Sequence, residues 1–258
     1  MKMLVSTHGH EAYSRASSAR VAWWIAWRQI REGLRSRSTW ILTLATTAVP
    51  LIFLYLSLRQ ALQDVRSIHN GSVGVQMAFY LLWLGLVTTL PALGIAAGAF
   101  AGEKENGSLA PLLVTPASNL AIFAGKIMGA VVGALGTSLL GIILYLLEVG
   151  LGFGWQTLTL LPVALSLLMI LLIPAIAFFG AGLASLISSR AKTFQAAQNY
   201  GSLILTLLWA GLIVLVVLFG ALGIWGFAIT VVVLYALDSL LIVFGASTWR
   251  REEVLARQ

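Results

Sequence analysis

Long apolar runs recur along the whole chain, and they constrain its fold more than any other feature of the sequence. A helix needs about 20 predominantly apolar residues to cross the hydrocarbon core of a membrane. Within that core, only helices and closed barrels satisfy every backbone polar group. Windows of about 19 residues predict six membrane-spanning helices. They cover residues 40–58, 77–101, 120–147, 160–188, 200–219 and 223–247.

Composition supports an all-α integral membrane protein. Hydrophobic residues make up 59% of the chain and charged residues 10%, whereas soluble domains have about a quarter of their residues charged. We expect residues 1–20 to form a polar tail that is retained, because this segment lacks the short apolar core of a secretory signal. An interfacial helix is expected at 21–38, the membrane domain at 39–248 and a cytoplasmic tail at 249–258.

Lysine and arginine are distributed unevenly between the predicted loops, which predicts the orientation. Of the 16 Lys and Arg residues, only Arg59 and Arg66 fall in the first, third or fifth loop. The others lie in the two termini and in the second and fourth loops. The sequence therefore predicts that both termini are cytoplasmic, in a multi-pass protein of the inner (plasma) membrane. The net charge of +7 is explained by these loops, and no nucleic-acid partner is expected.

The segment before the first predicted span has the pattern of an amphipathic helix. Its apolar side chains recur on one face, and its arginines lie on another. The apolar face contains Trp23, Trp27, Ile30 and Leu34, and the arginines are Arg28, Arg31 and Arg35. Tryptophan favours the headgroup level and arginine favours anionic lipid. We therefore expect this helix to lie flat on the membrane, with a solvated linker as the alternative.

Two predicted spans carry small residues at every fourth position. The second span has Gly94, Gly98 and Gly102; the third has Gly125, Gly129, Gly133, Thr137 and Gly141. Such rows let helix backbones approach closely in lipid. We expect both faces to pack against helices, either within the monomer or at the seam of a dimer.

A polar segment between the second and third spans concentrates charge and turn residues. It runs Gly102-Glu-Lys-Glu-Asn-Gly-Ser-Leu109, continues through Leu112-Leu113 and Thr115-Pro116, and is followed by Gly125-Lys126. This order resembles the signature of ABC-2 type permeases. The segment departs from that signature at Ser108, where threonine is common in the family, and at Pro111, where a helix former is usual.

A second stretch, Ile187 to Gln198, resembles the connection between the fourth and fifth helices of the same permeases, particularly those related to sodium-extrusion exporters. The resemblance implies the transmembrane subunit of an ATP-driven exporter. In such a subunit the loop 102–119 forms a coupling helix that docks on an ABC ATPase, and Arg190 and Lys192 make a second cytoplasmic contact.

The residues of the loop are compatible with docking. Leu109, Leu112 and Leu113 have the spacing of an apolar anchor on one helical face. Glu103, Lys104 and Glu105 are expected to form a charged rim that sets register, and Gly107 and Ser108 lie between the two groups. A solvated turn is the alternative.

The chain itself lacks an ATP-binding loop. The template G-x-x-x-x-G-K-[ST] fails around Gly125-Lys126, because Leu120 and Ile127 occupy the other two defining positions. We therefore expect ATP and magnesium on a partner ATPase, and no cofactor and no catalysis on this chain. The resemblance and the preference for closed twofold assemblies imply a homodimer or a pair with a related permease.

Asp238 is the carboxylate expected deepest in the membrane, and Glu148 is expected nearer the outer end. An intramembrane charge is costly and is a functional candidate by default. An ATPase-independent ion channel or secondary transporter that uses both residues is therefore an alternative function. The favoured interpretation is that Asp238 pairs with a nearby hydroxyl or arginine and that Glu148 reaches outward.

Other chemistry has little support. The chain has no cysteine, which excludes disulfides and thiolate sites. His8 and His10 stand in a polar tail without further ligands, so no metal site is expected. No serine nucleophile elbow or zinc-protease pattern is present, and an intramembrane enzyme is the least favoured alternative. Without a large external loop, the expected substrate is a small or amphipathic compound, with sodium second.

Overall fold

The computed structural model describes residues 7–35, 37–63, 71–107, 118–191 and 193–248. Its regular structure in these ranges is helical throughout. In chain order the elements are α1 (Thr7–Arg35), α2 (Arg37–Gln63), α4 (Ser72–Glu105), α6 (Asn119–Phe153), the 3-10 helix η1 (Trp155–Leu160), α7 (Val163–Arg190), α8 (Phe194–Leu222) and α9 (Ile224–Thr248).

Six of these helices, α2, α4, α6, α7, α8 and α9, are long and apolar enough to cross a membrane. This number agrees with the prediction, but the helices are longer than the apolar windows. α4 has 34 residues and α6 has 35. At 1.5 Å per residue each exceeds the roughly 30 Å hydrocarbon core. Helices run on because backbone hydrogen bonding continues where the apolar residues stop.

Local signals in the sequence explain where several helices begin. The side chain of Ser118 accepts a hydrogen bond from the Ala121 amide at 3.1 Å and starts α6. Thr193 starts α8 in the same way through the Ala196 amide. Such caps satisfy amides that have no partner within the helix. The predicted fourth span corresponds to α7, which begins just after Pro162, while η1 ends at Leu160.

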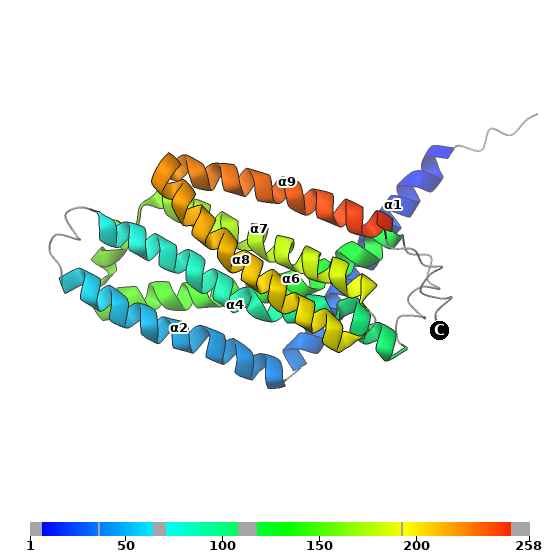
Figure 1. The fold of residues 1–258 in the computed structure, drawn as a ribbon, viewed down its shortest axis with the longest axis horizontal. Coiled ribbons are helices and arrows are strands. Elements are labelled where there is room, and N and C mark those ends of the chain that lie inside the picture. The colour runs from blue at the N-terminus through cyan, green and yellow to red at the C-terminus, as the bar shows by residue number, and fades with distance from the viewer. Residues whose placement is uncertain (1–6, 36, 64–70, 108–117, 192, 249–258) are drawn as a thin grey trace, which may run out of the picture.

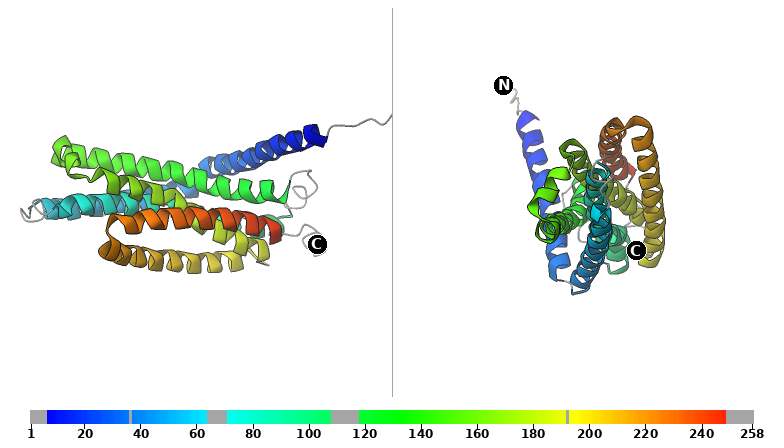
Figure 2. Two further views of the ribbon diagram at one scale, coloured as in Figure 1. Left: turned by 90° about the horizontal axis from the view of Figure 1, so that it is seen from above. Right: turned by 90° about the vertical axis from the view of Figure 1, so that its left-hand side faces the viewer.

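The connection between α8 and α9 is a single residue. Gly223 adopts φ +60°, a left-handed conformation that side chains other than glycine rarely adopt. Its amide donates to the Phe219 carbonyl at 2.8 Å. The two helices therefore run antiparallel as a tight hairpin along one outer side of the bundle (Figure 2).

α4 lies at the centre of the bundle, in contact with α2, α6, α7 and α8. Two groups of buried side chains surround it. One lies around the start of α4 and includes Met77, Tyr145 and Phe227. The other lies around its end and includes Phe100 and Phe123, whose rings stack at 5.5 Å. α4 is therefore held from several sides.

α1 leaves the bundle at an angle and packs along α6 (Figure 1). It begins at Thr7, within the segment expected to be a polar tail. Its packing face includes two alanines: Ala26 is fully buried and Ala22 nearly so. The Trp40 indole donates to the Leu34 carbonyl at 2.8 Å and ties α2 to α1.

Candidate functional site

One end of the bundle brings together the segments that the sequence singles out. α4 and α7 end there, and α6 and α8 begin there (Figure 1). We call it the loop end, because residues 106–118 connect α4 to α6 at this point. Lys104, Lys126 and Arg190 lie at the loop end, whereas Arg59 lies near the opposite end of α2. The lysines and arginines that the sequence concentrates in alternate loops therefore collect at the loop end of the bundle.

Glu103 and Lys126 form an ion pair that joins the end of α4 to the start of α6. The ammonium nitrogen of Lys126 lies 2.5 Å from Oε2 of Glu103 and also donates to the Ala99 carbonyl. It lies 4.5 Å from the ring centroid of Phe100. The Lys126 side chain is only 3% exposed, and a buried ammonium is tolerated only when such partners surround it. We call these four residues the α4–α6 clasp.

The next two residues of α4 contact the corner between α7 and α8. The ammonium nitrogen of Lys104 lies 3.4 Å from the carbonyl oxygens of both Ser189 and Ala191, at the end of α7. Glu105 accepts a hydrogen bond of 2.9 Å from the Phe194 amide, at the start of α8. Each charge meets the helix end whose dipole favours it.

Ser188 joins α7 to α4 from within the bundle. It is fully buried, and its hydroxyl oxygen accepts hydrogen bonds from the amides of Phe100, at 3.2 Å, and Ala101, at 3.0 Å. The two stretches recognised in the sequence, 102–126 and 187–198, are therefore in direct contact. Four helices meet at the loop end through specific polar bonds.

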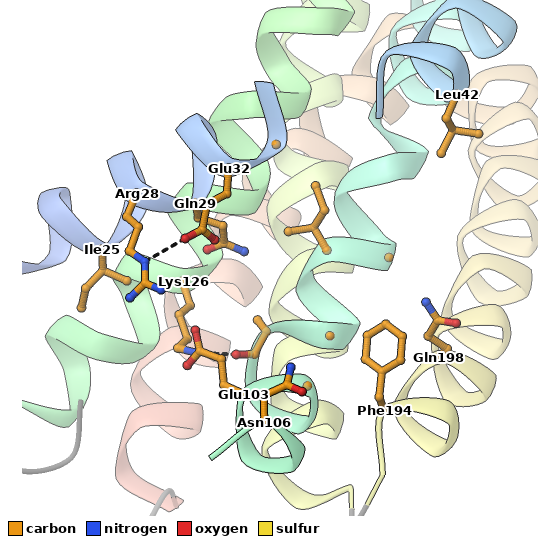
Figure 3. A pocket seen from close by; sticks show the side chains of 16 residues that line it. Ile25, Arg28, Gln29, Glu32, Leu42, Glu103, Asn106, Lys126, Phe194 and Gln198 are labelled. Carbon is orange, nitrogen blue, oxygen red and sulfur yellow. Dashed lines mark hydrogen bonds and ion pairs between the residues drawn. The ribbon is translucent and has the colours of Figure 1, made fainter. Parts of the chain in front are cut away.

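A pocket of about 620 Å³ lies beside the clasp, between α1, α4 and the start of α8 (Figure 3). Two ion pairs border the pocket. One is the Glu103–Lys126 pair of the clasp, and in the other Nε of Arg28 lies 2.9 Å from Oε1 of Glu32. Hydrogen bonding to Glu32, together with its charge, raises the pKa of Arg28 above its ordinary value. The charges within each ion pair cancel when both side chains are ionised. The border of the pocket is therefore polar and carries no net charge from these two pairs.

The predicted anchor residues of α1 are exposed, although Arg28 also borders the pocket. Trp23 is 50% exposed and Trp27 is 41% exposed, and their rings stack with centroids 6.3 Å apart. The Arg31 guanidinium lies 5.9 Å from the Trp27 centroid, and Arg28 is also exposed. The face that the sequence marks as apolar is thus separate from the alanine face that packs on α6.

The predicted coupling residues are only partly within the described ranges. Ser108, Leu109, Leu112, Leu113 and Lys192 lie outside them. Gly107 is described, and it is exposed with φ +68° just after α4. Arg190 is exposed at the end of α7.

The structure does not join the two intramembrane carboxylates. Asp238 lies on α9 with 6% exposure, and neither of its oxygens has a hydrogen-bond partner among the described residues. The pairing that we favour for Asp238 from the sequence is therefore not found there. Glu148 lies on α6, where one carboxylate oxygen is likewise buried without a partner. Asp238 has no bond to Glu148.

Lys126 was predicted only as one of the loop charges and not as a site residue. The sequence does contain a signal for this residue. A lysine about two turns inside an apolar helix needs a buried partner. Ser188 and Phe194 gave no comparable signal, because their contacts with α4 join residues far apart in the chain. Within the described ranges, no three His, Asp or Glu side chains gather in a way that could hold a metal ion.

Comparison with known proteins adds the family. Residues 23–224 match the family described as ABC-2 family transporter protein. No curated protein matches the chain. The matched range begins in α1 and ends at the start of α9, so it includes the loop end, the clasp and five of the apolar helices. The chain therefore belongs to the ABC-2 family of transporter proteins, as a multi-pass membrane permease component of an ABC transporter.

Proposed function

We propose that the chain exports its substrate when a separate ABC ATPase docks on the loop end. The observation that carries this proposal is the bonding at that end. The clasp joins α4 to α6, and the bonds of Lys104, Glu105 and Ser188 join α4 to α7 and α8. A displacement of the loop therefore reaches four spanning helices. ATP and magnesium belong to the partner in this proposal, because the chain has no ATP-binding loop.

The contacts of α4 reduce the number of residues that we assign to the proposed docking surface. Glu103 and Lys104 bond within the chain, so they support the loop rather than form its outer rim. The docking surface then consists of Gly107, Ser108 and the three leucines Leu109, Leu112 and Leu113. An apolar anchor of this kind can enter a groove on a partner. Arg190, which is exposed nearby, and Lys192 provide the second contact.

The loop end faces the cytosol in this proposal. Lysine and arginine collect at that end of the bundle, which is the cytoplasmic side in most membrane proteins. In an inner (plasma) membrane this arrangement places both termini in the cytosol, where an ATPase can reach them. The exposed tryptophans and arginines of α1 support its place at the headgroup level.

The assembly that we propose contains two permeases and two ATPases. α8 and α9 are the least buried of the six spanning helices, so they are available to lipid or to a second permease, whether the same chain or a related one. A small or amphipathic compound that enters from the cytosol or the inner leaflet is the proposed substrate.

Purification of the chain from its native membrane tests the partnership. We expect an ABC ATPase to accompany the wild-type chain and to hydrolyse ATP faster than the isolated ATPase. Replacing Leu112 and Leu113 together by Asp should remove both association and stimulation, because carboxylates cannot enter an apolar groove without losing hydration.

Leu120→Asp is the matched control for that pair. Leu120 is 48% exposed just after the loop, outside the proposed docking surface, so this variant should keep the ATPase. Full association and stimulation by the Leu112/Leu113 variant would contradict the docking model.

A second candidate function follows from Asp238, whose buried carboxylate has no hydrogen-bond partner among the described residues. It is an ATPase-independent ion pathway through the bundle. Vesicles that contain the purified chain alone should then conduct sodium ions or protons, and Asp238→Asn should stop the flux. If such vesicles are tight to both ions, this candidate is excluded.

A further inference from the structure

Lys126 has an environment that only its charge explains. Its ammonium is removed from water, and it contacts the Ala99 carbonyl, the Glu103 carboxylate and the face of the Phe100 ring. Loss of any partner leaves a buried charge that is poorly compensated. A neutral side chain of similar shape fits the space but makes none of these polar contacts. The clasp therefore fixes one relative position of α4 and α6.

The clasp lies across the two flanks of the loop. Ala99, Phe100 and Glu103 belong to the last two turns of α4, and Lys126 belongs to the second full turn of α6. The residues between these flanks include the whole proposed docking surface. The distance between the flanks is therefore set by a bond inside the permease, before any partner binds.

α1 is attached at the same turn of α6. A side chain at Gly125, next to Lys126, would meet the Ala22 carbonyl oxygen at 2.7 Å, and one at Gly129 would meet Gln29 at 2.6 Å. α1 thus contacts α6 on both sides of Lys126 in the sequence. Arg28, on α1, interacts electrostatically with both members of the ion pair across the pocket (Figure 3).

A gain in stability does not by itself explain why a buried ion pair such as Glu103–Lys126 is present. Replacing a buried ion pair with well-packed apolar residues is often neutral for stability, whereas fixing a register is its best-attested use. The position of this pair, at the flanks of the loop and at the attachment of α1, favours the second role.

We propose that Lys126 is a positioning residue, which holds the two flanks of the loop at a fixed distance so that the ATPase moves α1, α4 and α6 as one body. The inference rests on the proposed function. It assigns Glu103 to this internal bond and makes the clasp, rather than the docking surface, the part that converts docking into movement of the helices.

The first test needs no ATPase. The chain contains no cysteine, so Asn106→Cys and Leu120→Cys place one spin label on each flank of the loop. Pulsed electron resonance should give a narrow distance distribution for this pair in lipid nanodiscs. Lys126→Met should at least double its width. Lys104→Met is the matched control, because Lys104 bonds to α7, and it should leave the width unchanged.

The second test uses the complex with the ATPase that co-purifies from the native membrane. Lys126→Met should bind the ATPase with an affinity within about twofold of wild type and melt within a few degrees of it. Its maximal stimulation of ATP hydrolysis should fall about tenfold, equivalent to about 1.4 kcal/mol. A merely structural role predicts parallel losses of melting temperature and affinity instead.

A tether provides the rescue. Glu103→Cys combined with Lys126→Cys should lose stimulation, and a short bifunctional thiol reagent that joins the two cysteines should restore it. An unchanged width of the label-distance distribution in Lys126→Met, or wild-type stimulation by that variant, would overturn the inference. Failure of the wild-type chain to bind any ATPase would overturn the proposed function, while the label distances would still test the clasp.

Discussion

The glycine rows of α4 and α6 have the same four-residue spacing, but they meet different neighbours. In α6, an added Cβ at Gly125 would come within 2.7 Å of the Ala22 carbonyl oxygen of α1, and one at Gly129 would come within 2.6 Å of the Gln29 side chain and 3.1 Å of the Ala26 Cα. About one turn beyond Gly129, Gly133 has open space around it. The first half of the α6 row is therefore a seat for a helix.

The α4 row faces no helix backbone. Gly98 and Gly102 meet the ring of Phe194 at the start of α8, and Gly94 has nothing within 4 Å of an added Cβ. All three line the pocket beside the clasp. A row of glycines thus shows that a helix can be approached closely, but the topology decides whether another backbone, a single ring or open space lies beside it.

The largest effect is expected where the seat of α1 is filled. Gly125→Leu should destabilise the protein by about 3 kcal/mol, because backbone atoms of α1 cannot move aside as a side chain can. Gly133→Leu, on the same helix but in open space, is the control. Thermal unfolding in nanodiscs measures both variants, and equal melting temperatures would show that the rows do not differ as described.

An intermediate effect is expected at the buried side of α4, where α7 supports the helix instead of α1. Ser188→Ala should cost about 1.5 kcal/mol, because the buried hydroxyl that links α7 to two amides of α4 is lost. Ser189→Ala should cost less, since the Ser189 hydroxyl bonds only to the Leu186 carbonyl of its own helix. Denaturant titration of the two variants checks the difference, and a larger loss for Ser189→Ala contradicts it.

A smaller effect is expected where a ring is the only obstacle. Gly98→Ala places a Cβ 2.5 Å from the Phe194 ring, which can rotate away, and the cost should be about 1 kcal/mol. In a Phe194→Ala background the same change should be neutral. A double-mutant cycle measures this coupling, and additive effects would mean that the ring does not fill the α4 row.

The smallest effect is a gain. Gly94→Ala should stabilise the protein by about 0.5 kcal/mol, because alanine favours the helix over glycine and meets no neighbour here. A measurable loss of stability in the isolated chain would show that this part of the pocket is closed in the monomer. A loss that appears only in the assembled transporter would place a partner there.

The sequence predicts the spans and the polar ends well because both depend on local composition. The hydrophobic runs set the number of helices, and Ser118 and Thr193 have the side chains that start α6 and α8. The lysines and arginines indicate at which end of the bundle the basic charge is concentrated. None of these features requires knowledge of which helices are neighbours.

The candidate site is harder to predict because its bonds join distant residues. Glu103 and Lys126 are 2.5 Å apart across the loop, yet nothing in the sequence chooses Glu103 over Glu105 as the partner. The alanines of α1 that pack on α6 were not predicted as a packing face, because the tryptophans of the neighbouring face give the stronger apolar pattern. The seat for α1 follows only from the tertiary arrangement.

The one-residue turn at Gly223 also bears on how the chain enters a membrane. Residues 193–237 contain no Lys, Arg, Asp or Glu, so no charge marks a stopping point at the turn. A single residue leaves almost no length for a loop outside the membrane between α8 and α9. We therefore expect the two helices to enter the bilayer together as a hairpin, with an orientation set by the basic residues that flank it, Lys192 before and Arg250 and Arg251 after.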